Sequence, residues 1–167
     1  MNNWFLCKVK YDKTLENGKQ KKVSEQYVLN AFSFTEAEAL FIHEITPYIS
    51  GDMEVTAINK TKISEIVFDK YGIESKVDAE AKAIMGQNKS MSGEADKWFK
   101  CKLNFITLDE KTGKEKKTPT YLLVNAGSVN AAHNLIDIHM KGTLSDYVIE
   151  RIDETPIMDV FIFSEKQ

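Results

Sequence analysis

Arginine is almost absent from this chain of 167 residues, because Arg151 is the only arginine among 22 basic residues. Arginine grips a phosphate or a base edge with two parallel hydrogen bonds, so its scarcity argues against a site built on such forks. Any bound anion would instead meet the point charges of lysines. The sequence also lacks a long apolar run and a charged-then-apolar leader, so we expect a soluble, cytoplasmic protein without a membrane segment.

Residues able to carry out chemistry are few. His43 has no second histidine at the spacing of a zinc helix, and His133 and His139 would fall on different faces of a helix. Cys7 and Cys101 have neither a CxxC partner nor a neighbouring base, so we expect buried, reduced thiols with a structural role. No pair of carboxylates stands out for acid–base work. The sequence therefore predicts no enzyme, no metal site and no cofactor.

A short aromatic segment occurs twice. Residues 4–8 read WFLCK and residues 98–102 read WFKCK, which match at four of five positions 94 residues apart. The lysine-rich stretch GKQKK at 18–22 returns as GKEKK at 113–117, and further matches continue towards the end of the chain. Such self-similarity predicts one module used twice. We assign a first repeat to 1–68, a connector with the pattern of a short helix to 69–97, and a second repeat to 98–167.

The hydrophobic pattern predicts the same order of elements in both repeats. Apolar and polar side chains alternate over 4–11 and 98–105, as in a half-buried strand. A glycine-centred turn, a second strand and an amphipathic helix follow, and Thr35 and Glu38 have the pattern of a capping box. Two more strands close each repeat, at 53–60 and 63–68 and at 147–152 and 157–163. The predicted fold is α+β, a tandem duplication of a strand-strand-helix-strand-strand unit with antiparallel sheets, one helix per repeat and an approximate two-fold axis.

Charge is distributed unevenly along the chain. The net charge is −3, yet residues 1–30 carry six lysines against three acids and residues 97–125 carry seven lysines against three acids. Each predicted repeat therefore has a basic hairpin in front of an acidic remainder, and any anionic ligand would bind at the hairpins.

On the first strand of each repeat a tryptophan shares the outer face with lysines. One interpretation is that the tryptophan caps the edge of a sheet while the lysines keep exposed strands from pairing with neighbours. The other is that an exposed aromatic ring stacks a base while the lysines attract the phosphates. The candidate ligand-binding residues are Trp4, Lys8, Lys10, Lys21, Lys22, Trp98, Lys100, Lys102, Lys116 and Lys117.

Three segments carry a resemblance to a known family, namely WFLCKV at 4–9, SFTEAEA at 33–39 and KLNFITLDE at 102–110. On these segments the chain resembles a family of uncharacterised small proteins of Bacteroides-type bacteria and their phages. The resemblance implies a cytoplasmic protein of a phage or mobile element, and it brings no catalytic residues with it.

We therefore expect a non-enzymatic protein that binds single-stranded nucleic acid or nucleotides through the basic, tryptophan-containing hairpins of both repeats. The alternative is a protein–protein adaptor or inhibitor of a phage or mobile element, including one that sequesters a host nucleotide signal. The first function needs exposed, continuous faces of tryptophan and lysine. The second needs an apolar surface patch or an obligate homo-oligomer.

Overall fold

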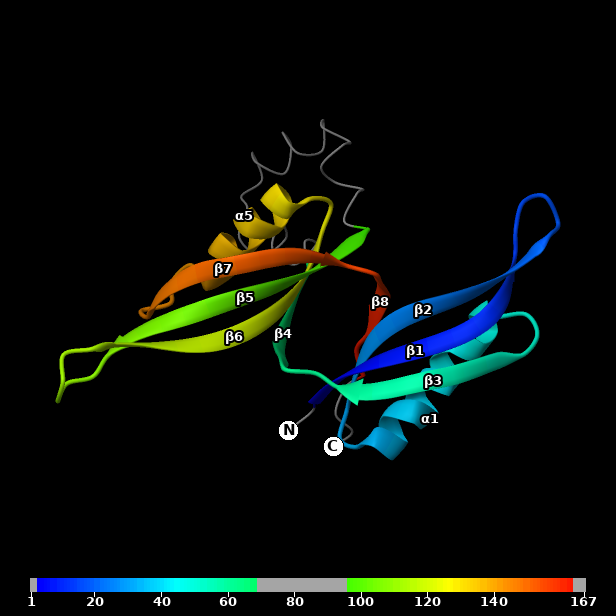
Figure 1. Cartoon of the computed structure of the whole chain (residues 1–167), viewed down its shortest axis with the longest axis horizontal. Coiled ribbons are helices and arrows are strands. Elements are labelled where there is room, and N and C mark those ends of the chain that lie inside the picture. The colour runs from blue at the N-terminus through cyan, green and yellow to red at the C-terminus, as the bar shows by residue number, and fades with distance from the viewer. Residues whose placement is uncertain (1–2, 69–95, 164–167) are drawn as a thin grey trace. The chain divides into compact units, whose positions relative to one another are not determined.

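Strands make up most of the part of the chain that a computed structural model describes, residues 3–68 and 96–163. They form two four-stranded sheets, which two α-helices accompany (Figure 1). The mixed α+β class predicted from the sequence is confirmed. In chain order the elements are β1 (Asn3–Thr14), β2 (Gln20–Ala31), α1 (Phe34–Ile45), the 3-10 helix η1 (Thr46–Tyr48), β3 (Met53–Lys60), β4 (Ile63–Phe68), β5 (Lys97–Leu108), β6 (Glu115–Ala126), α5 (Val129–Met140), β7 (Asp146–Thr155) and β8 (Ile157–Phe161).

The described elements divide between two compact units. Unit 1 comprises Met1–Lys62 with Pro156–Gln167, and unit 2 comprises Ile63–Thr155. The sheet of unit 1 has the strand order β3-β1-β2-β8, and α1 packs on one of its faces. The sheet of unit 2 has the order β4-β6-β5-β7, and α5 packs on one of its faces. Within the described residues, no helix has the length and apolarity needed to cross a membrane.

A long hairpin forms the middle of each sheet. β1 pairs with β2 and β5 pairs with β6, and each of these strands has 12 residues. Gly18 and Gly113 lie in the two turns with φ angles of +80° and +68°, a left-handed conformation that glycine adopts without strain. The predicted alternation is observed on β1, where Phe5, Cys7 and Val9 are buried on the face that α1 covers.

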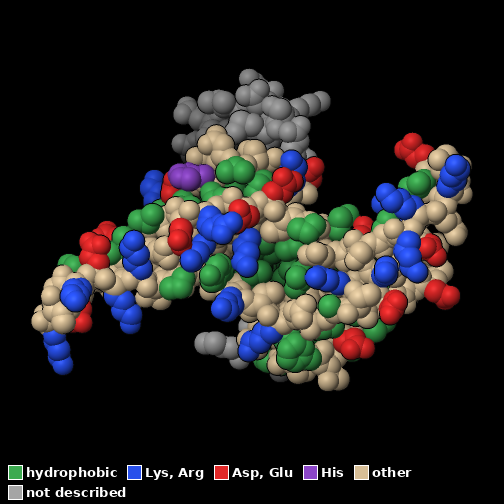
Figure 2. All heavy atoms as spheres, in the orientation of Figure 1, with side chains coloured by type: hydrophobic (Ala, Val, Ile, Leu, Met, Phe, Trp, Pro, Cys, Tyr) green, Lys and Arg blue, Asp and Glu red, His purple; other side chains and the backbone are tan. Residues whose placement is uncertain are grey.

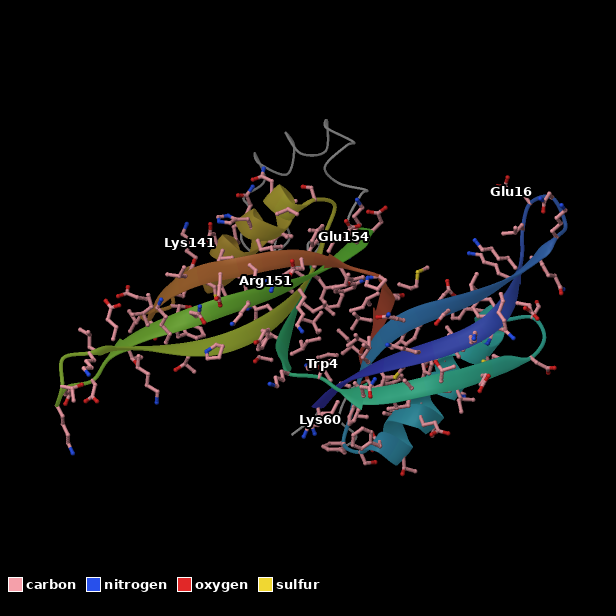
Figure 3. All side chains as sticks on the ribbon, in the orientation of Figure 1. Trp4, Glu16, Lys60, Lys141, Arg151 and Glu154 are labelled. Carbon is pink, nitrogen blue, oxygen red and sulfur yellow. The ribbon has the colours of Figure 1, made fainter. Side chains whose placement is uncertain are left out.

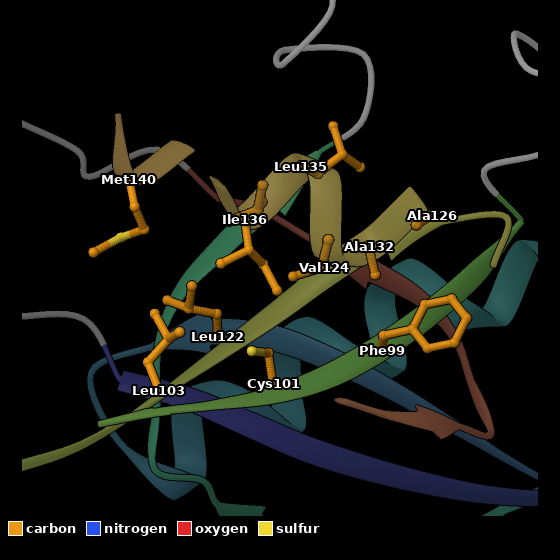
Figure 4. Close-up of a cluster of buried hydrophobic side chains, with 11 residues drawn as sticks. Phe99, Cys101, Leu103, Leu122, Val124, Ala126, Ala132, Leu135, Ile136 and Met140 are labelled. Carbon is orange, nitrogen blue, oxygen red and sulfur yellow. The ribbon is translucent and has the colours of Figure 1, made fainter. Parts of the chain in front are cut away.

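The core of unit 2 joins this hairpin to its helix. Phe99, Cys101 and Leu103 of β5 lie in one cluster with Ala132 and Ile136 of α5 (Figure 4). Full burial of a side chain such as Ile136 contributes about 1.5–3 kcal/mol relative to leaving it in water. The amphipathic stripe read from the sequence therefore holds α5 on the sheet.

Each helix begins at a serine. Ser33 and Ser128 have extended backbones, and the side-chain oxygen of Ser33 accepts a hydrogen bond of 3.1 Å from the N–H of Glu36. The predicted capping box of Thr35 and Glu38 is therefore wrong, because both residues already lie inside α1. An N-cap must have a non-helical backbone, and the extended residue is Ser33, two positions earlier.

The last strand of each predicted repeat lies in the sheet that is built on the hairpin of the other repeat. β8 pairs with β2 in parallel, with Val160 opposite Val28, and β4 pairs with β6 in parallel. The prediction of purely antiparallel sheets is therefore wrong. Connection length explains the exchange, because two residues join β3 to β4 and only Pro156 joins β7 to β8. A strand that returns parallel within one sheet needs a crossover of about a dozen residues or more.

Threonines mark the positions where the chain leaves each sheet. The N–H and the hydroxyl of Thr61 both donate to the carbonyl oxygen of Trp4 at 2.8 Å, directly after β3. The hydroxyl of Thr155 donates to the carbonyl oxygen of Trp98 at 2.7 Å, at the end of β7. The backbone carbonyl of each tryptophan therefore fixes the chain at the end of the neighbouring strand, β3 or β7.

The predicted ranges 1–68, 69–97 and 98–167 describe repeats of sequence, and they stay a prediction, as does the two-fold relation between them. The compact units differ from these ranges through the exchange of β4 and β8. The short helix expected in the connector after Ser75 lies outside the described residues.

Candidate anion-binding faces

The sheet surface opposite the helix carries lysines in both units, and we call this surface the lysine face. In unit 1 the alternation that buries Phe5, Cys7 and Val9 places Lys8 and Lys10 on the opposite side. Lys22 lies on the same side, because it pairs with Asp12, which is two residues after Lys10 on β1 and faces the same way. In unit 2 the lysines on this side of the sheet are Lys100, Lys102 and Lys117, and Asn104 stands at the position that corresponds to Lys10.

Two of the predicted site lysines lie on the other surface. Lys21 pairs with Lys13, which shares the parity of Cys7 and Val9 and so lies on the helix side of the sheet. Lys116 pairs with Thr107 on the helix side of unit 2. All four of these residues are exposed on the outer halves of the hairpins. Figure 2 shows lysine side chains near both hairpin tips. The predicted set is therefore split between two surfaces in each unit.

The two tryptophans do not form a pair of exposed platforms. Trp98 is buried, with 4% of its surface exposed, and its ring meets the ring of Phe68 edge to face at 5.5 Å between centroids. Trp4 is half-buried near Lys60 at the start of β1 (Figure 3). The expectation that Trp98 stacks a base on an exposed face is wrong. Leu123, which pairs with Lys100 on the same side of the sheet as Trp98, is buried as well.

Acids of β7 neutralise much of the lysine face of unit 2. The Nζ atom of Lys102 lies 2.9 Å from a carboxylate oxygen of Glu150, and the side-chain amide of Asn104 donates to the same oxygen at 2.9 Å. Because the ammonium of Lys102 donates to Glu150, the pKa of the Glu150 carboxyl is lowered and the pKa of Lys102 is raised. The charge of Lys117 lowers the pKa of Glu150 further. Glu150 therefore already occupies part of this face.

Two more ion pairs involve charges of β7. The guanidinium of Arg151 lies 3.0 Å from the carboxylate of Asp153, and Lys97 lies 3.6 Å from Glu154. Arg151 and Glu154 both project from β7 in Figure 3. Lys100, which is exposed on the same face, lies with its Nζ atom 5.1 Å from the centre of the Tyr121 ring. Of the three lysines on the lysine face of unit 2, Lys102 is therefore the one that forms an ion pair with a described carboxylate.

The corresponding strand of unit 1 is poor in acids. β3 carries Glu54 as its single carboxylate, whereas β7 carries four. Glu54 stands opposite Lys10 and Asp12 opposite Lys22 in the ladders, yet neither carboxylate forms an ion pair with a described lysine. Every ion pair between described residues falls in unit 2. The lysine face of unit 1 is therefore the less compensated of the two.

The cysteines match the prediction from the sequence. Cys7 and Cys101 are both unpaired and completely buried. Burial raises the pKa of each thiol to about 12, so both are protonated at neutral pH. A protonated thiol is a poor nucleophile, and the predicted burial of both cysteines is confirmed. Within the described part of the chain, no three His, Cys, Asp or Glu side chains gather as metal ligands would.

Glu150 is the residue of this site that sequence reasoning missed. The signal was the acidic composition of DYVIERIDET at 146–155, compared with MEVTAINK at 53–60. Its partner could not be read from the sequence, because Lys102 is 48 residues away and the register depends on an irregularity in the ladder.

With the fold and these faces described, comparison with known proteins places the chain in a family. A family model described as a domain of unknown function (DUF4494) matches residues 3–163, so the chain belongs to this family. The match spans both units and every described strand. A search of curated proteins finds no match.

Proposed function

We propose that the chain is a non-enzymatic protein that binds single-stranded nucleic acid or nucleotides, with lysines of the hairpins holding the phosphates. The observation that supports this is the group of Lys8, Lys10 and Lys22 on one surface of unit 1, without an ion pair to any described carboxylate. On an extended strand Lys8 and Lys10 are spaced by about 6.6 Å. Lysines in such a row offer point charges to successive phosphates of a flexible strand.

Charge, rather than stacking, would supply most of the affinity. Trp98 is buried, and Trp4 is only half accessible, so at most one of the two predicted rings is available to a base. Binding through lysines alone is sensitive to salt and has little preference for sequence. The proposed affinity is therefore modest.

We further infer that the two sequence repeats arose by duplication of one module. The serine caps Ser33 and Ser128 and the threonine bonds of Thr61 and Thr155 occupy corresponding positions of the two halves. A duplicated binder would carry one basic hairpin in each repeat. The resemblance to proteins of Bacteroides-type bacteria and their phages would place this activity in the cytoplasm of an infected or element-bearing cell.

A protein–protein adaptor is the second candidate function. Phe32 and Phe34, on either side of the α1 cap, are 54% and 55% exposed. Exposed phenylalanines are costly to leave in water and are common anchors of interfaces. This function predicts that alanine at both positions removes a partner while leaving any binding of nucleic acid intact.

The binding function can be tested by titrating a fluorescein-labelled oligothymidine of about 20 nucleotides at about 50 mM and about 200 mM salt. We expect rising anisotropy at tens of micromolar protein and weaker binding at the higher salt concentration. Replacement of Lys21, Lys22, Lys116 and Lys117 by glutamine should flatten the dependence of log K on log salt. Lys141→Gln is a suitable control, because this exposed lysine follows α5, outside both hairpins. Absence of binding by the unaltered protein would refute the proposal and leave the adaptor as the better candidate.

A further inference from the structure

A β-bulge occurs at the corresponding place in both units, in the β1–β3 ladder of unit 1 and in the β5–β7 ladder of unit 2. In unit 1, Lys8 pairs with Ala57 and Val9 with Val55, so Thr56 is an extra residue in β3. In unit 2, Lys102 pairs with Arg151 and Leu103 with Ile149, so the extra residue in β7 is Glu150. At a bulge of this kind the side chain of the extra residue points in a different direction from the one it would have in a regular ladder.

The two bulge residues have opposite effects on the neighbouring lysine. The carboxylate of Glu150 accepts from Lys102 at 2.9 Å and from Asn104. The hydroxyl of Thr56 instead donates to the backbone carbonyl oxygen of Lys8 at 3.4 Å and brings no charge. Thr56 is also exposed, so the surface around Lys8 is open at this point.

From this difference we propose that unit 1 is the principal phosphate-binding surface of the protein and that the bulge residue sets the strength of each lysine face. This inference rests on the proposed binding of nucleic acid. Glu150 acts as an internal anion that competes with a phosphate for Lys102 and lowers the potential at Lys117. Unit 1 has a neutral residue at the same position, so all three lysines of its face are available to phosphates of a single strand.

Matched triple variants of the full chain test the first part of this inference. Lys8, Lys10 and Lys22 are replaced by glutamine in one variant, and Lys100, Lys102 and Lys117 in the other. Each phosphate contact contributes about 0.7 to the slope of log K against log salt for a single strand. We expect the unit 1 variant to lose about 2 from this slope, and the unit 2 variant to lose about 0.7, because only Lys100 lies away from Glu150.

Exchange of the bulge residues tests the second part and does not remove any lysine. Thr56→Glu should reduce the slope by about 0.7, and Glu150→Gln should increase it by about 0.7 while keeping an acceptor for Asn104. Thr56→Gln is the control for size and should leave the slope unchanged. Thermal unfolding of each variant shows whether a loss of binding comes from a loss of fold.

The outcomes separate this inference from the proposed function. If labelled oligothymidine binds the unaltered protein and the two triple variants lose equal slope, the assignment to unit 1 is wrong while the binding function stands. Lack of any effect of Thr56→Glu and Glu150→Gln would likewise overturn the role of the bulge. If the unaltered protein fails to bind, the proposed function itself is refuted, and this inference with it.

Discussion

Asn30 offers a direct test of the strand exchange. Among residues 3–68 and 96–163, it is the only polar residue that is buried, with 6% of its surface exposed. Its side-chain amide donates to the carbonyl oxygen of Phe163 at 2.8 Å, and its side-chain oxygen accepts from the N–H of Phe163 at 2.7 Å. These two bonds join β2 to the segment that follows β8, 133 residues later in the sequence. They exist only if β8 lies in the sheet of unit 1.

Asn30→Ala removes both bonds at once. Each net hydrogen bond contributes about 0.5–1.5 kcal/mol, so the free energy of unfolding should fall by about 1–3 kcal/mol. The larger end of this range applies if the freed N–H and C=O groups of Phe163 stay out of water. Urea unfolding followed by circular dichroism measures the loss, and hydrogen exchange of the Phe163 amide locates it.

Asn125→Ala is the matched control in unit 2. Asn125 is half-buried and donates one bond of 3.0 Å to the carbonyl oxygen of Lys97, which is local to the β5–β6 ladder. We expect it to cost no more than about 1 kcal/mol. Equal losses for the two variants, together with unchanged protection of the Phe163 amide in Asn30→Ala, would show that β8 is not held on β2 and would refute the exchange.

Three further predictions concern the thiols and the helix caps. Burial raises the pKa of Cys7 and Cys101 to about 12, whereas the thiols of the unfolded chain ionise from about pH 9. Between about pH 9 and pH 12 the unfolded state therefore binds fewer protons than the folded state. The free energy of unfolding should fall as pH rises above about 9, by up to about 1.4 kcal/mol per pH unit for each thiol. Urea unfolding between about pH 8 and pH 10.5 measures this loss, and the same slope in a variant with alanine at both positions would contradict it. Both thiols should react slowly with a thiol reagent in the native state, and fast labelling would show that they are accessible. Ser33→Ala should cost about 1 kcal/mol in urea unfolding and Thr35→Ala about 0.5 kcal/mol or less, whereas a larger loss at Thr35 would favour the later helix start.

Local patterns in the sequence predicted much of the fold. The alternation around Cys7 and Cys101 identified the buried face of each central strand, because a strand places successive side chains on opposite faces. The stripes of α1 and α5 and the strands 53–60 and 63–68 were found for the same reason, since their periodicity depends only on neighbouring residues. The start of α1 was placed two residues late, because SFT offers two residues able to cap a helix and only one of them has an extended backbone.

The candidate site could be predicted only in part. Lysine content and parity placed Lys8, Lys10, Lys100 and Lys102 on one side of their strands. The partners of these lysines depend on long-range register, so the pairing of Lys102 with Glu150 was beyond the reach of the sequence. Burial of Trp98 was missed for a related reason, because an outward position on a strand does not reveal what packs on the outer face.

The sequence by itself determined the strands, the helices and the buried thiols, since each follows from periodicity and composition over a few residues. Tertiary structure alone decided which sheet receives β4 and β8. Their alternating patterns would suit either sheet, because Ile63, Glu65 and Ile66 correspond in type to Ile157, Asp159 and Val160. Links of one and two residues are too short for a parallel return to the same sheet, so each strand pairs with the hairpin of the other sequence repeat.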